Sequence, residues 1–521
     1  MTDRPAAIEL ADLSMAGIRD DQLRGRPVTV LGLARSGIAL ARFLHDAGAH
    51  VTVYDARPGS ELGPAIAALE GRAVDLQLGP DVDPATTWSG AALVTTSPSI
   101  NPDYPTTEPR LRGALRALVD ARAAGDRSAP ALVSEADLFL RLCPAPVVGV
   151  TGTKGKTTTA SLAHAILATD AVHPAILGGN IGTPIVERLP ELTPDHRVVF
   201  ELSELQLPTL STGTTVAVYT NVTSDHLDRH GSLEAYRRVK ERLAELVAPD
   251  GALVLNADDP IVAAYAGHGR STAIRYRLGS PGAGELGIVD DWIVADGIGR
   301  LTLTGGGPAT TGPGGRILPL DDVPLFGRHN VANTLAAVAV GLLFGIEPSA
   351  IRRGVSSFTG VEHRLEPVAE IDGVRFVNDS MGTQPDAVIA ALESFDPPLV
   401  LIAGGRDKGV DLSALAIVVA RRAAAAVLIG ESGPTLERLF RDAGLETTER
   451  AATLELAVER ADGLARDAMT GGPGSPPATV LLSPAAASFD MFDDYAVRGR
   501  AFRDAVTQIA ERRADRQGRE P

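Results

Sequence analysis

The stretch PVVGVTGTKGKTTTASL, residues 146–162, decides the fold of the central part of the chain. Pro146 to Val150 has the apolar, β-branched character of a buried strand, and Thr158 to Ala168 has the composition of a helix. Glycine, threonine and lysine fill the turn between them. Glycines let backbone N–H groups approach phosphate oxygens, and the N-terminus of the following helix adds a favourable dipole. The stretch therefore predicts a phosphate-binding loop between a strand and a helix.

Two side chains of this loop suit nucleotide binding. Lys156 places a positive charge near the β- and γ-phosphates, and Thr157 offers a hydroxyl to Mg²⁺. The spacing from Gly149 to Gly155 is one residue longer than in G-x-x-x-x-G-K, so the loop is a variant P-loop. On the pattern alone, a purely structural turn is the alternative.

A second glycine-rich turn lies near the N-terminus. Gly32 to Gly37 follow the apolar run Val28 to Leu31, and Asp55 ends the next predicted strand, which begins at His50. This arrangement is similar to the dinucleotide-binding fingerprint, but Ala34 replaces the middle glycine and hinders close approach of a pyrophosphate. A structural turn, a nicotinamide cofactor and a different ligand all stay open at this point.

Short apolar runs alternate with helical segments along the chain, which predicts an α/β protein with parallel sheets. Further strands are predicted at Arg197–Leu202, Val216–Asn221, Ala252–Asn256, Arg375–Asn378, Leu399–Ala403, Ala426–Ile429 and Val480–Ser483. The Gly-, Pro- and Thr-rich segment 279–319 predicts hairpins, with short runs at Asp291–Val294 and Arg300–Thr304. These blocks predict three α/β domains at residues 1–133, 134–360 and 361–521, ending in a solvated polar tail from Glu511.

Composition excludes several classes of protein. With 49 Lys and Arg against 65 Asp and Glu the net charge is −16, and a nucleic-acid or anionic-membrane binder needs a basic surface instead. The single cysteine, Cys143, excludes an internal disulfide and a cysteine-based zinc cluster. The longest apolar run, Leu335 to Ile346, is shorter than the roughly 20 residues of a membrane span. We expect a cytoplasmic, monomeric protein without membrane insertion.

Polar residues directly follow several predicted strands, where open α/β sheets bind ligands. Glu201 and His226 both follow such strands and are candidate ligands of a cation near the P-loop. Since the sequence has no H-E-x-x-H or Cys/His spacing, Mg²⁺ held through oxygen and water is favoured over zinc. Arg364, next to an apparent linker, suits developing phosphoryl charge. For Lys240, spacing alone predicts a solvated basic helix face.

Taken in order, the motifs resemble those of the Mur ligase family from about Val28 to Phe502. They are Thr151–Thr158, Gly179–Gly182, Glu201–Ser203 with Gln206, Asn221–Thr223 through Asp228–His230, Gly327–Asn330 with Asn333, His363–Arg364, Asn378–Ser380 and Ser483–Asp490. The last motif is similar to the form found in the glutamate-adding branch.

The resemblance implies an ATP-dependent ligase of peptidoglycan precursor synthesis. Such an enzyme adds glutamate, with D-glutamate favoured, to UDP-N-acetylmuramoyl-L-alanine through an acyl phosphate, with ATP as substrate and Mg²⁺ as cofactor. It also implies a Rossmann-like N-terminal UDP-binding domain, a central P-loop ATPase-type domain and a Rossmann-like C-terminal domain that binds the amino acid. On this interpretation Asp55 serves a UDP-sugar and no nicotinamide is involved.

The resemblance also implies roles for individual residues. The catalytic set is Lys156, Lys240, Arg364, His226 and Glu201, and the metal ligands are Thr157, Glu201, His226 and Lys240, the last if carbamylated. ATP would contact Gly152, Thr153, Lys154, Gly155, Lys156, Thr157, Thr158, Asn330, Asn333, Arg364 and Asp379. The UDP-sugar would contact Arg35, Ser36, Asp55, Ser97, Asn180, Ser203 and Gln206, and the amino acid Thr383, Lys408, Ser488, Phe489 and Tyr495.

Two positions depart from the family pattern. Met381 stands where a lysine usually follows Asn-Asp-Ser, so a cation expected near the glutamate carboxylates is missing, and Arg375 and Arg406 are candidate replacements. Lys154 replaces a frequent asparagine in the P-loop. L-glutamate or another acceptor therefore stays open. So do a folate-extending relative, a nucleotide-binding protein without catalysis and a nicotinamide-dependent oxidoreductase.

Overall fold

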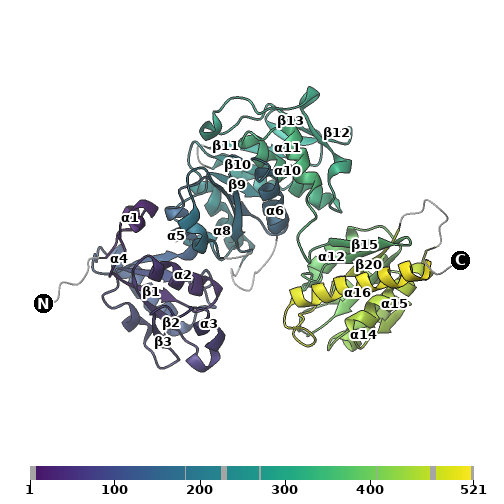
Figure 1. Cartoon of the computed structure of the whole chain (residues 1–521), viewed down its shortest axis with the longest axis horizontal. Helices are drawn as coiled ribbons and strands as arrows, with labels where there is room; N and C mark the ends of the chain where they lie inside the picture. The colour runs from purple at the N-terminus through teal and green to yellow at the C-terminus, as the bar shows by residue number, and fades with distance from the viewer. Residues whose placement is uncertain are drawn as a thin grey trace. The chain divides into compact units, whose positions relative to one another are not determined.

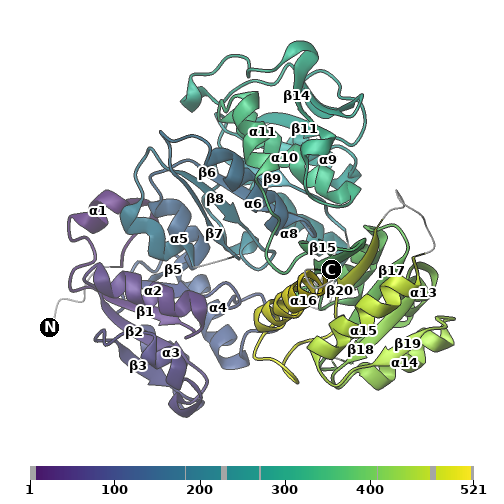
Figure 2. The ribbon, with the colours of Figure 1, turned by 45° about the vertical axis from the view of Figure 1, so that its right-hand side comes forward.

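The computed structural model describes residues 7–181, 184–223, 232–268, 271–407, 409–469 and 477–517. This part of the chain forms two compact units, Met1–Val323 with Ala332–Ser356, and Pro324–Val331 with Ser357–Pro521. Figure 1 and Figure 2 show both units. The predicted α/β class with parallel sheets is confirmed. The division into three domains at residues 133 and 360 stays a prediction.

The first sheet of the first unit has the strand order β3-β2-β1-β4-β5 among the described residues, and every pairing in it is parallel. Its strands are β1 Pro27–Leu31, β2 His50–Asp55, β3 Asp75–Leu78, β4 Leu93–Thr96 and β5 Ala131–Ser134. Its helices are α1 Met15–Arg19, α2 Arg35–Asp46, α3 Gly63–Ala67 and α4 Pro109–Ala123, with short 3-10 turns at Leu10–Asp12, Gly59–Glu61 and Pro84–Trp88. Apolar side chains of α2 pack on one face of the sheet and those of α4 on the other.

The second sheet of this unit has the order β14-β13-β12-β11-β10-β9-β6-β8-β7 among the described residues. Strands β6 Val147–Thr151, β7 Ala175–Gly179, β8 Arg197–Glu201, β9 Val216–Tyr219, β10 Ala252–Asn256, β11 Thr272–Tyr276 and β12 Glu285–Val289 are parallel. Strands β13 Trp292–Asp296 and β14 Arg316–Pro319 extend the sheet antiparallel. The carboxyl ends of β6, β8 and β9 therefore meet at one edge.

Helices cover both faces of this second sheet. They are α5 Glu135–Leu142, α6 Lys156–Leu167, α8 Leu233–Leu246, α9 Pro260–Ala264, α10 Arg328–Leu343 and α11 Pro348–Ser356, with 3-10 turns at Ile185–Glu191, Leu207–Thr209, Tyr265–Gly267, Thr302–Thr304, Pro313–Gly315 and Leu320–Asp322. One apolar core runs from the first sheet through α5 to the second, which explains why both sheets share one compact unit.

The predicted hairpins between residues 279 and 319 are confirmed by the β12–β13 and β13–β14 pairings. The predicted extended run Arg300–Thr304 is wrong, because Thr302–Thr304 is a 3-10 turn. Three glycines with positive φ, Gly305 to Gly307, follow it directly and end any extended segment. The Leu301 N–H also bonds to the Leu343 carbonyl of α10 at 2.9 Å, which holds the segment against that helix.

The second unit contains one mixed sheet in the order β15-β16-β20-β17-β18-β19 among the described residues. Its strands are β15 Glu366–Ile371, β16 Val374–Asn378, β17 Leu399–Gly404, β18 Ala425–Ile429, β19 Thr448–Arg450 and β20 Ala478–Leu482. Its helices are α12 Pro385–Glu393, α13 Ser413–Arg422, α14 Gly433–Asp442, α15 Leu454–Asp467 and α16 Tyr495–Gln517. One apolar core joins α15 and α16 to one face of the sheet, and a second joins α12, α13 and α14 to the other.

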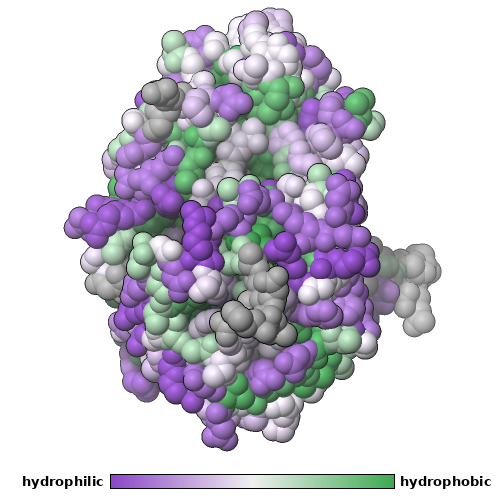
Figure 3. All heavy atoms as spheres, turned by 90° about the vertical axis from the view of Figure 1, so that its left-hand side faces the viewer, coloured by the Kyte–Doolittle hydropathy of each residue, from purple (hydrophilic) through white to green (hydrophobic). Residues whose placement is uncertain are grey.

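The predicted polar tail begins inside α16, which continues to Gln517, and Glu511, Arg512 and Ala514 are exposed as predicted. Arg513 is only 13% exposed and donates to the Ile371 carbonyl at 3.2 Å and to Asp372 at 3.0 Å. These bonds tie the end of the helix to the β15–β16 turn. No helix in the described residues is long and apolar enough to span a bilayer. On the face drawn in Figure 3, hydrophilic residues predominate and hydrophobic ones lie in scattered groups.

Candidate active site

The P-loop lies between a strand and a helix, as predicted; it leaves β6 at Thr151 and enters α6 at Lys156, two residues before the predicted helix start. Gly152 has φ 146° and Gly155 φ 86°, conformations that side chains with a Cβ atom rarely adopt. A Cβ atom at Gly152 would lie 2.0 Å from Thr220 Oγ1, and one at Gly155 would lie 2.4 Å from Asn333 Oδ1. Both glycines are therefore required by the backbone path and by the close packing around the loop.

Two features of the loop suit an anion. Gly155 is the N-cap of α6 and provides no side-chain cap, so the positive end of the helix dipole faces the loop. Lys156 Nζ lies over the loop and donates to the carbonyls of Gly152 at 3.1 Å and Thr153 at 2.8 Å. Lys154 is exposed. Asn333 packs against the same loop and accepts a hydrogen bond from Thr159 Oγ1 at 3.2 Å.

Glu201 stands at the end of β8, paired in register with Val150 on the neighbouring strand that leads into the P-loop. Its side chain is 1% exposed, and Oε1 accepts a hydrogen bond from Asn180 Nδ2 at 3.1 Å. Oε2 has no hydrogen-bond partner among the described residues. A buried carboxylate oxygen without a partner is costly, so this atom is suited to a bound cation.

A second predicted metal ligand, Thr157, also lies in the described part of the chain. Thr157, whose hydroxyl is a further predicted oxygen ligand, lies in the first turn of α6 and is buried. In the described ranges there is no group of three or more His, Cys, Asp or Glu side chains that could hold a metal. Mg²⁺ needs few protein ligands because it keeps several waters and substrate oxygens. The other predicted ligand, His226, lies outside the described residues.

Lys240 is fully buried, so the solvated face predicted from its spacing is wrong. Its Nζ donates to the Gly152 carbonyl at 3.0 Å and to Thr151 Oγ1 at 3.4 Å, and lies 5.4 Å from the centre of the Tyr236 ring. The physical reason lies in α8, where Tyr236, Lys240, Leu243 and Ala244 form one buried stripe. This i, i+4, i+7, i+8 pattern is visible in the sequence and is the signal that could have placed Lys240 inward.

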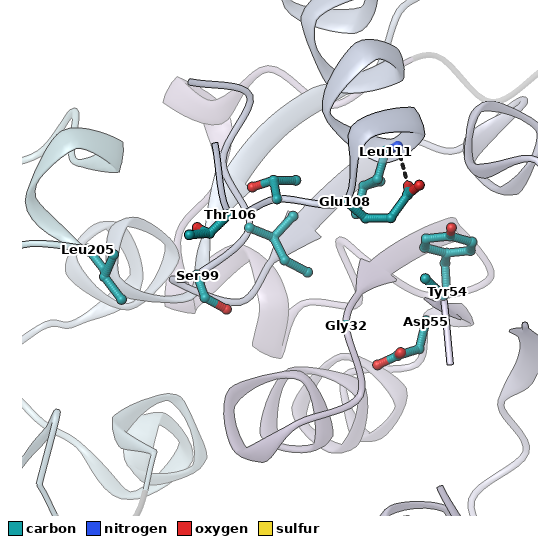
Figure 4. A pocket seen from close by; sticks show the side chains of 11 residues that line it. Gly32, Tyr54, Asp55, Ser99, Thr106, Glu108, Leu111 and Leu205 are labelled. Atoms are coloured by element: carbon teal, nitrogen blue, oxygen red, sulfur yellow. Dashed lines mark hydrogen bonds between the residues drawn. The ribbon is translucent and has the colours of Figure 1, made fainter. Parts of the chain in front are cut away.

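A pocket of about 280 Å³ opens between loops of the first sheet and the segment that follows β8 (Figure 4). Its lining includes Asp55, which is a predicted UDP-sugar contact, and also Gly32 and Ser99, which lie close in sequence to other predicted contacts. Leu205, from the segment after Glu201, forms part of the wall and lies across the pocket from Asp55 in Figure 4. The cavity therefore connects the N-terminal glycine turn with the segment that carries Ser203 and Gln206.

Asp55 is held firmly at the end of β2. Its carboxylate accepts hydrogen bonds from the N–H of Leu33 at 2.8 Å and the N–H of Arg57 at 3.0 Å. The Arg57 guanidinium adds two more, from Nε at 3.0 Å and Nη2 at 2.8 Å. Burial raises the pKa of Asp55, but these hydrogen bonds outweigh it and hold the pKa below its usual value. Asp55 is thus an oriented anion at the pocket.

The other predicted UDP-sugar residues also lie in the first unit. Arg35 and Ser36 form the first turn of α2, and Ser97 is buried, its Oγ having no partner among the described residues. Ser203 donates its N–H at 2.9 Å and its hydroxyl at 3.0 Å to Gln206 Oε1, which orders this short segment.

Sequence reasoning missed several residues that line the pocket, among them Tyr54, Thr107, Glu108 and Leu205. The Tyr54 hydroxyl is buried without a partner among the described residues, and burial raises its pKa. Glu108 caps α4 by accepting the Leu111 N–H at 2.7 Å, and its place directly before Pro109 is a helix-start signal. Nothing in the local sequence reveals that Leu205 faces this pocket.

In the second unit, Asp379 follows β16 and is 5% exposed. Ser483 Oγ donates to its Oδ2 at 2.6 Å, and the Leu365 N–H donates to Oδ1 at 3.2 Å. Burial raises its pKa to about 6, against the Ser483 hydrogen bond and the charge of Arg364. Arg364 and Asp379, both predicted ATP contacts, are therefore brought together in this unit.

The raised pKa of Asp379 predicts a pH-dependent stability. Below pH ~4 the carboxyl is neutral in both states. Between about pH 4 and 6 the native state binds more protons than the unfolded state, so stability falls as pH rises. Asp379→Asn removes this loss, so the free energy of unfolding of the variant should rise relative to that of the wild type across that window, by up to ~3 kcal/mol. Calorimetry of the full chain at several pH values measures the difference; parallel curves for the two proteins would contradict the buried, raised pKa.

Four of the five predicted amino-acid-binding residues belong to the described part of this unit: Thr383 after β16, Ser488 and Phe489 after β20, and Tyr495 at the start of α16. Ser488 is buried, Phe489 is 65% exposed, and Tyr495 begins α16 and is 44% exposed. The Thr383 N–H bonds to the Met381 carbonyl at 2.7 Å. Lys408 lies outside the described residues. Asn330, a predicted ATP contact, donates to the Phe326 carbonyl at 2.8 Å in the same unit.

A buried cation that sequence reasoning missed lies beside these residues. Arg498, on α16, is 1% exposed and donates to Ser380 Oγ at 3.0 Å and to the Ser380 carbonyl at 2.9 Å. It also donates to the Ala486 carbonyl at 3.3 Å, and burial lowers its pKa to about 10. Of the suggested replacements for the missing lysine, Arg375 lies over the Phe326 ring and near Glu370, and Arg406 is exposed.

Comparison with known proteins shows the family of the chain. A family model described as the Mur ligase middle domain matches residues 150–341, and one described as the Mur ligase glutamate ligase domain matches residues 363–486. The first match contains the P-loop, Glu201 and Lys240; the second contains Arg364 and Asp379. The chain belongs to the Mur ligase family, and the resemblance drawn from its motifs is confirmed, as is the prediction of a ligase.

Individual relatives are similar over nearly the whole chain. A UDP-N-acetylmuramoylalanine–D-glutamate ligase of Symbiobacterium thermophilum is 36% identical over 498 residues, covering 95% of this chain and 100% of the relative. A ligase of the same name from a Roseiflexus species is 38% identical, covering 93% and 99%. Among solved structures, MurF of Acinetobacter baumannii aligns with a TM-score of 0.51 at 17% identity, over 87% of this chain and 91% of that one, which supports the fold alone.

Proposed function

We propose that the chain joins glutamate to the carboxylate of UDP-N-acetylmuramoyl-L-alanine at the expense of ATP, with D-glutamate as the favoured acceptor. One observation above all supports the proposal. Relatives named UDP-N-acetylmuramoylalanine–D-glutamate ligase align with nearly the entire chain at 36% and 38% identity, across both compact units. The P-loop, the buried Glu201 and the buried Lys240 supply the charged groups that such a reaction needs.

The proposed reaction has two steps. A carboxylate oxygen of the UDP-sugar attacks the γ-phosphorus of ATP, the bond to the bridging oxygen breaks, and ADP leaves. The amine of glutamate then attacks the acyl carbon, loses a proton, and displaces phosphate that carries the former carboxylate oxygen. In the first step Lys156 and the N-terminus of α6 offset the charge of the phosphates. Arg364 is the proposed partner of the moving phosphoryl group.

Glu201 Oε2 and the Thr157 hydroxyl are the described atoms that would hold Mg²⁺, with His226 and a carbamylated Lys240 proposed as further ligands. When bound there, Mg²⁺ supplies positive charge that offsets repulsion between the carboxylate and the γ-phosphate. The fit depends on Oε2, which is buried and has no partner among the described residues. Lys240 Nζ and Glu201 both lie against the exit of β6, which supports a shared role.

The pocket beside Asp55 is the proposed binding site of the nucleotide part of the UDP-sugar. Its size, about 280 Å³, is at the lower limit of ligand pockets and suits part of a nucleotide. Because Leu205 forms one wall, a ligand seated there lies beside the segment of Ser203 and Gln206. That placement supports the proposal that these residues, with Asn180, position the muramoyl-alanine arm toward Glu201.

The proposed acceptor site lies in the second unit. Met381 removes the usual lysine, whereas Arg498 supplies a buried cation bonded to Ser380 and Ala486. Ser380 directly precedes the position of the missing lysine, and Ala486 belongs to the motif that contains the predicted contacts Ser488 and Phe489. We therefore retain D-glutamate as acceptor. We also propose the three-domain layout with a Rossmann-like first and third domain, and a monomeric protein in the cytoplasm.

A ligation assay with both enantiomers tests the proposed function. Phosphate release is followed with ATP, Mg²⁺ and UDP-N-acetylmuramoyl-L-alanine, with D-glutamate and L-glutamate in parallel reactions. We expect release that requires the sugar nucleotide and D-glutamate together. Faster release with L-glutamate would instead favour the alternative acceptor. If neither enantiomer stimulates release, the proposed substrates are wrong.

A further inference from the structure

The side chain of Asn221, which follows β9, clamps one residue of the P-loop. The Lys154 N–H donates to Asn221 Oδ1 at 2.9 Å, and Asn221 Nδ2 donates to the Lys154 carbonyl at 2.9 Å. The Asn221 backbone carbonyl also accepts the Thr153 N–H at 2.8 Å. A carboxamide carries a donor and an acceptor on one short side chain, so Asn can bond both backbone groups of a residue and Asp cannot.

The neighbouring residue strengthens this clamp. Thr220 Oγ1 donates to the Lys154 carbonyl at 2.6 Å, so that carbonyl accepts two hydrogen bonds from the exit of β9. The same segment approaches Gly152 so closely that a Cβ atom there would lie 3.0 Å from the Asn221 carbonyl oxygen. The P-loop is thus held from one side by Thr220 and Asn221, the two residues that directly follow β9.

The clamp determines which loop amides face a ligand. Since Thr153 and Lys154 donate their N–H groups to Asn221, those two amides are not directed at phosphate. The first helical bond of α6 joins the Thr159 N–H to the Gly155 carbonyl at 2.9 Å. The N–H groups of Gly155, Thr157 and Thr158 precede this bond and lie outside the helix's own hydrogen-bond ladder. The phosphate-binding donors are therefore concentrated at the start of α6.

We propose that Asn221 is a positioning residue for the triphosphate: it fixes Lys154 and thereby aims the amides at the start of α6 toward the β- and γ-phosphates. The proposal rests on the proposed use of ATP and deepens it. Asn221 itself needs no contact with the nucleotide. Its removal lets the Lys154 peptide rotate, so that the loop must be ordered again each time a nucleotide binds.

The test compares the binding of two nucleotides by calorimetry, using the full chain. The non-hydrolysable ATP analogue adenylyl imidodiphosphate, with Mg²⁺, has the β- and γ-groups that the loop would hold, whereas AMP lacks them. We expect Asn221→Ala to weaken binding of the analogue about 10- to 100-fold, since two hydrogen bonds are lost. AMP affinity should stay within about twofold of wild type.

Asn256→Ala is the matched control. Asn256 Nδ2 donates to the Thr220 carbonyl at 2.8 Å, so this variant loosens the same strand exit without touching the Lys154 peptide. We expect it to bind the analogue like the wild type. Thr220→Val, which removes the Oγ1 bonds to the Lys154 carbonyl at 2.6 Å and to the Thr151 carbonyl at 3.4 Å, should weaken binding about 3- to 10-fold. If Asn221→Ala does not fold, the Thr220→Val variant tests the proposal in its place.

The outcomes separate the clamp from the proposed function. Unchanged analogue affinity in Asn221→Ala and Thr220→Val would overturn the clamp. So would an equal loss for AMP, or an equal loss in Asn256→Ala, because either indicates general loosening. A wild type that binds no analogue contradicts both the clamp and the ligase. If the affinity for the analogue depends on Asn221 but the protein ligates no glutamate, the clamp is supported and the proposed function is wrong.

Discussion

We expect Glu201→Gln to lower kcat about 100- to 1,000-fold while leaving the protein folded. Glutamine keeps the shape of glutamate and its acceptor for Asn180, but it replaces the unpartnered Oε2 with an uncharged amide. The proposed Mg²⁺, which offsets the charge of two anionic reactants, would lose its buried anionic ligand. A fall in kcat of this size is typical when one electrostatic partner of the reaction is removed. Steady-state kinetics with saturating substrates and varied Mg²⁺ give kcat and the Mg²⁺ requirement.

Glu285→Gln is the matched control for this variant. Glu285 is also a buried glutamate of the first unit, 8% exposed, but its carboxylate pairs with Arg277 at 2.9 Å instead of lying beside the P-loop. The kcat of the Glu285→Gln variant should stay within about twofold of the wild-type value. The thermal midpoint of Glu201→Gln should not fall, because the change removes a buried charge without a full set of partners. Wild-type kcat in Glu201→Gln would refute the proposed role of this residue.

The second large effect is expected for Lys240→Ala. Lys240 is fully buried with Nζ against the Gly152 carbonyl and Thr151 Oγ1, so its truncation leaves a cavity beside the P-loop. If the lysine acts as a carbamate, the variant loses an anion. We then expect kcat to fall about 1,000-fold and to recover partly when formate or acetate is added. Activity is measured against rising concentrations of each carboxylate.

Two controls decide which charge Lys240 carries during catalysis. Lys156→Ala removes the loop lysine, whose proposed role is cationic, and short carboxylates should not restore its activity. Recovery of Lys240→Ala by small alkylammonium ions, rather than by carboxylates, would show that the unmodified cation is needed. Full activity without any additive would show that Lys240 is not needed at all.

The sequence predicted those parts of the site that depend on short local patterns. The P-loop, its two glycines and its position between β6 and α6 follow from one strand-turn-helix stretch, and Glu201 follows from its place at the end of a buried strand. Arg364 and Asp379 are brought together because the segment carrying Arg364 and the end of β16 bond through the Leu365 N–H. The three sheets likewise agree with the alternating pattern of apolar runs and helices.

What the sequence missed depends on contacts between distant segments. Lys240 was assigned to solvent because neighbouring arginines and glutamates dominate α8, although Tyr236, Leu243 and Ala244 share its buried stripe. Leu205 lines the pocket from a segment more than a hundred residues beyond the N-terminal glycine turn, and no local pattern predicts a contact over that distance. Arg498 lies in a strongly charged helix, so its burial against Ser380 appears only once α16 is placed on the sheet.

The most direct test of the proposed reaction follows the oxygen atoms of the carboxylate. UDP-N-acetylmuramoyl-L-alanine labelled with ¹⁸O in its carboxylate is incubated with the protein, ATP, Mg²⁺ and D-glutamate, and the released phosphate is analysed by mass spectrometry. Ligation through an acyl phosphate transfers one labelled oxygen to each phosphate as the amide forms. Formation of the amide product with unlabelled phosphate would contradict that route.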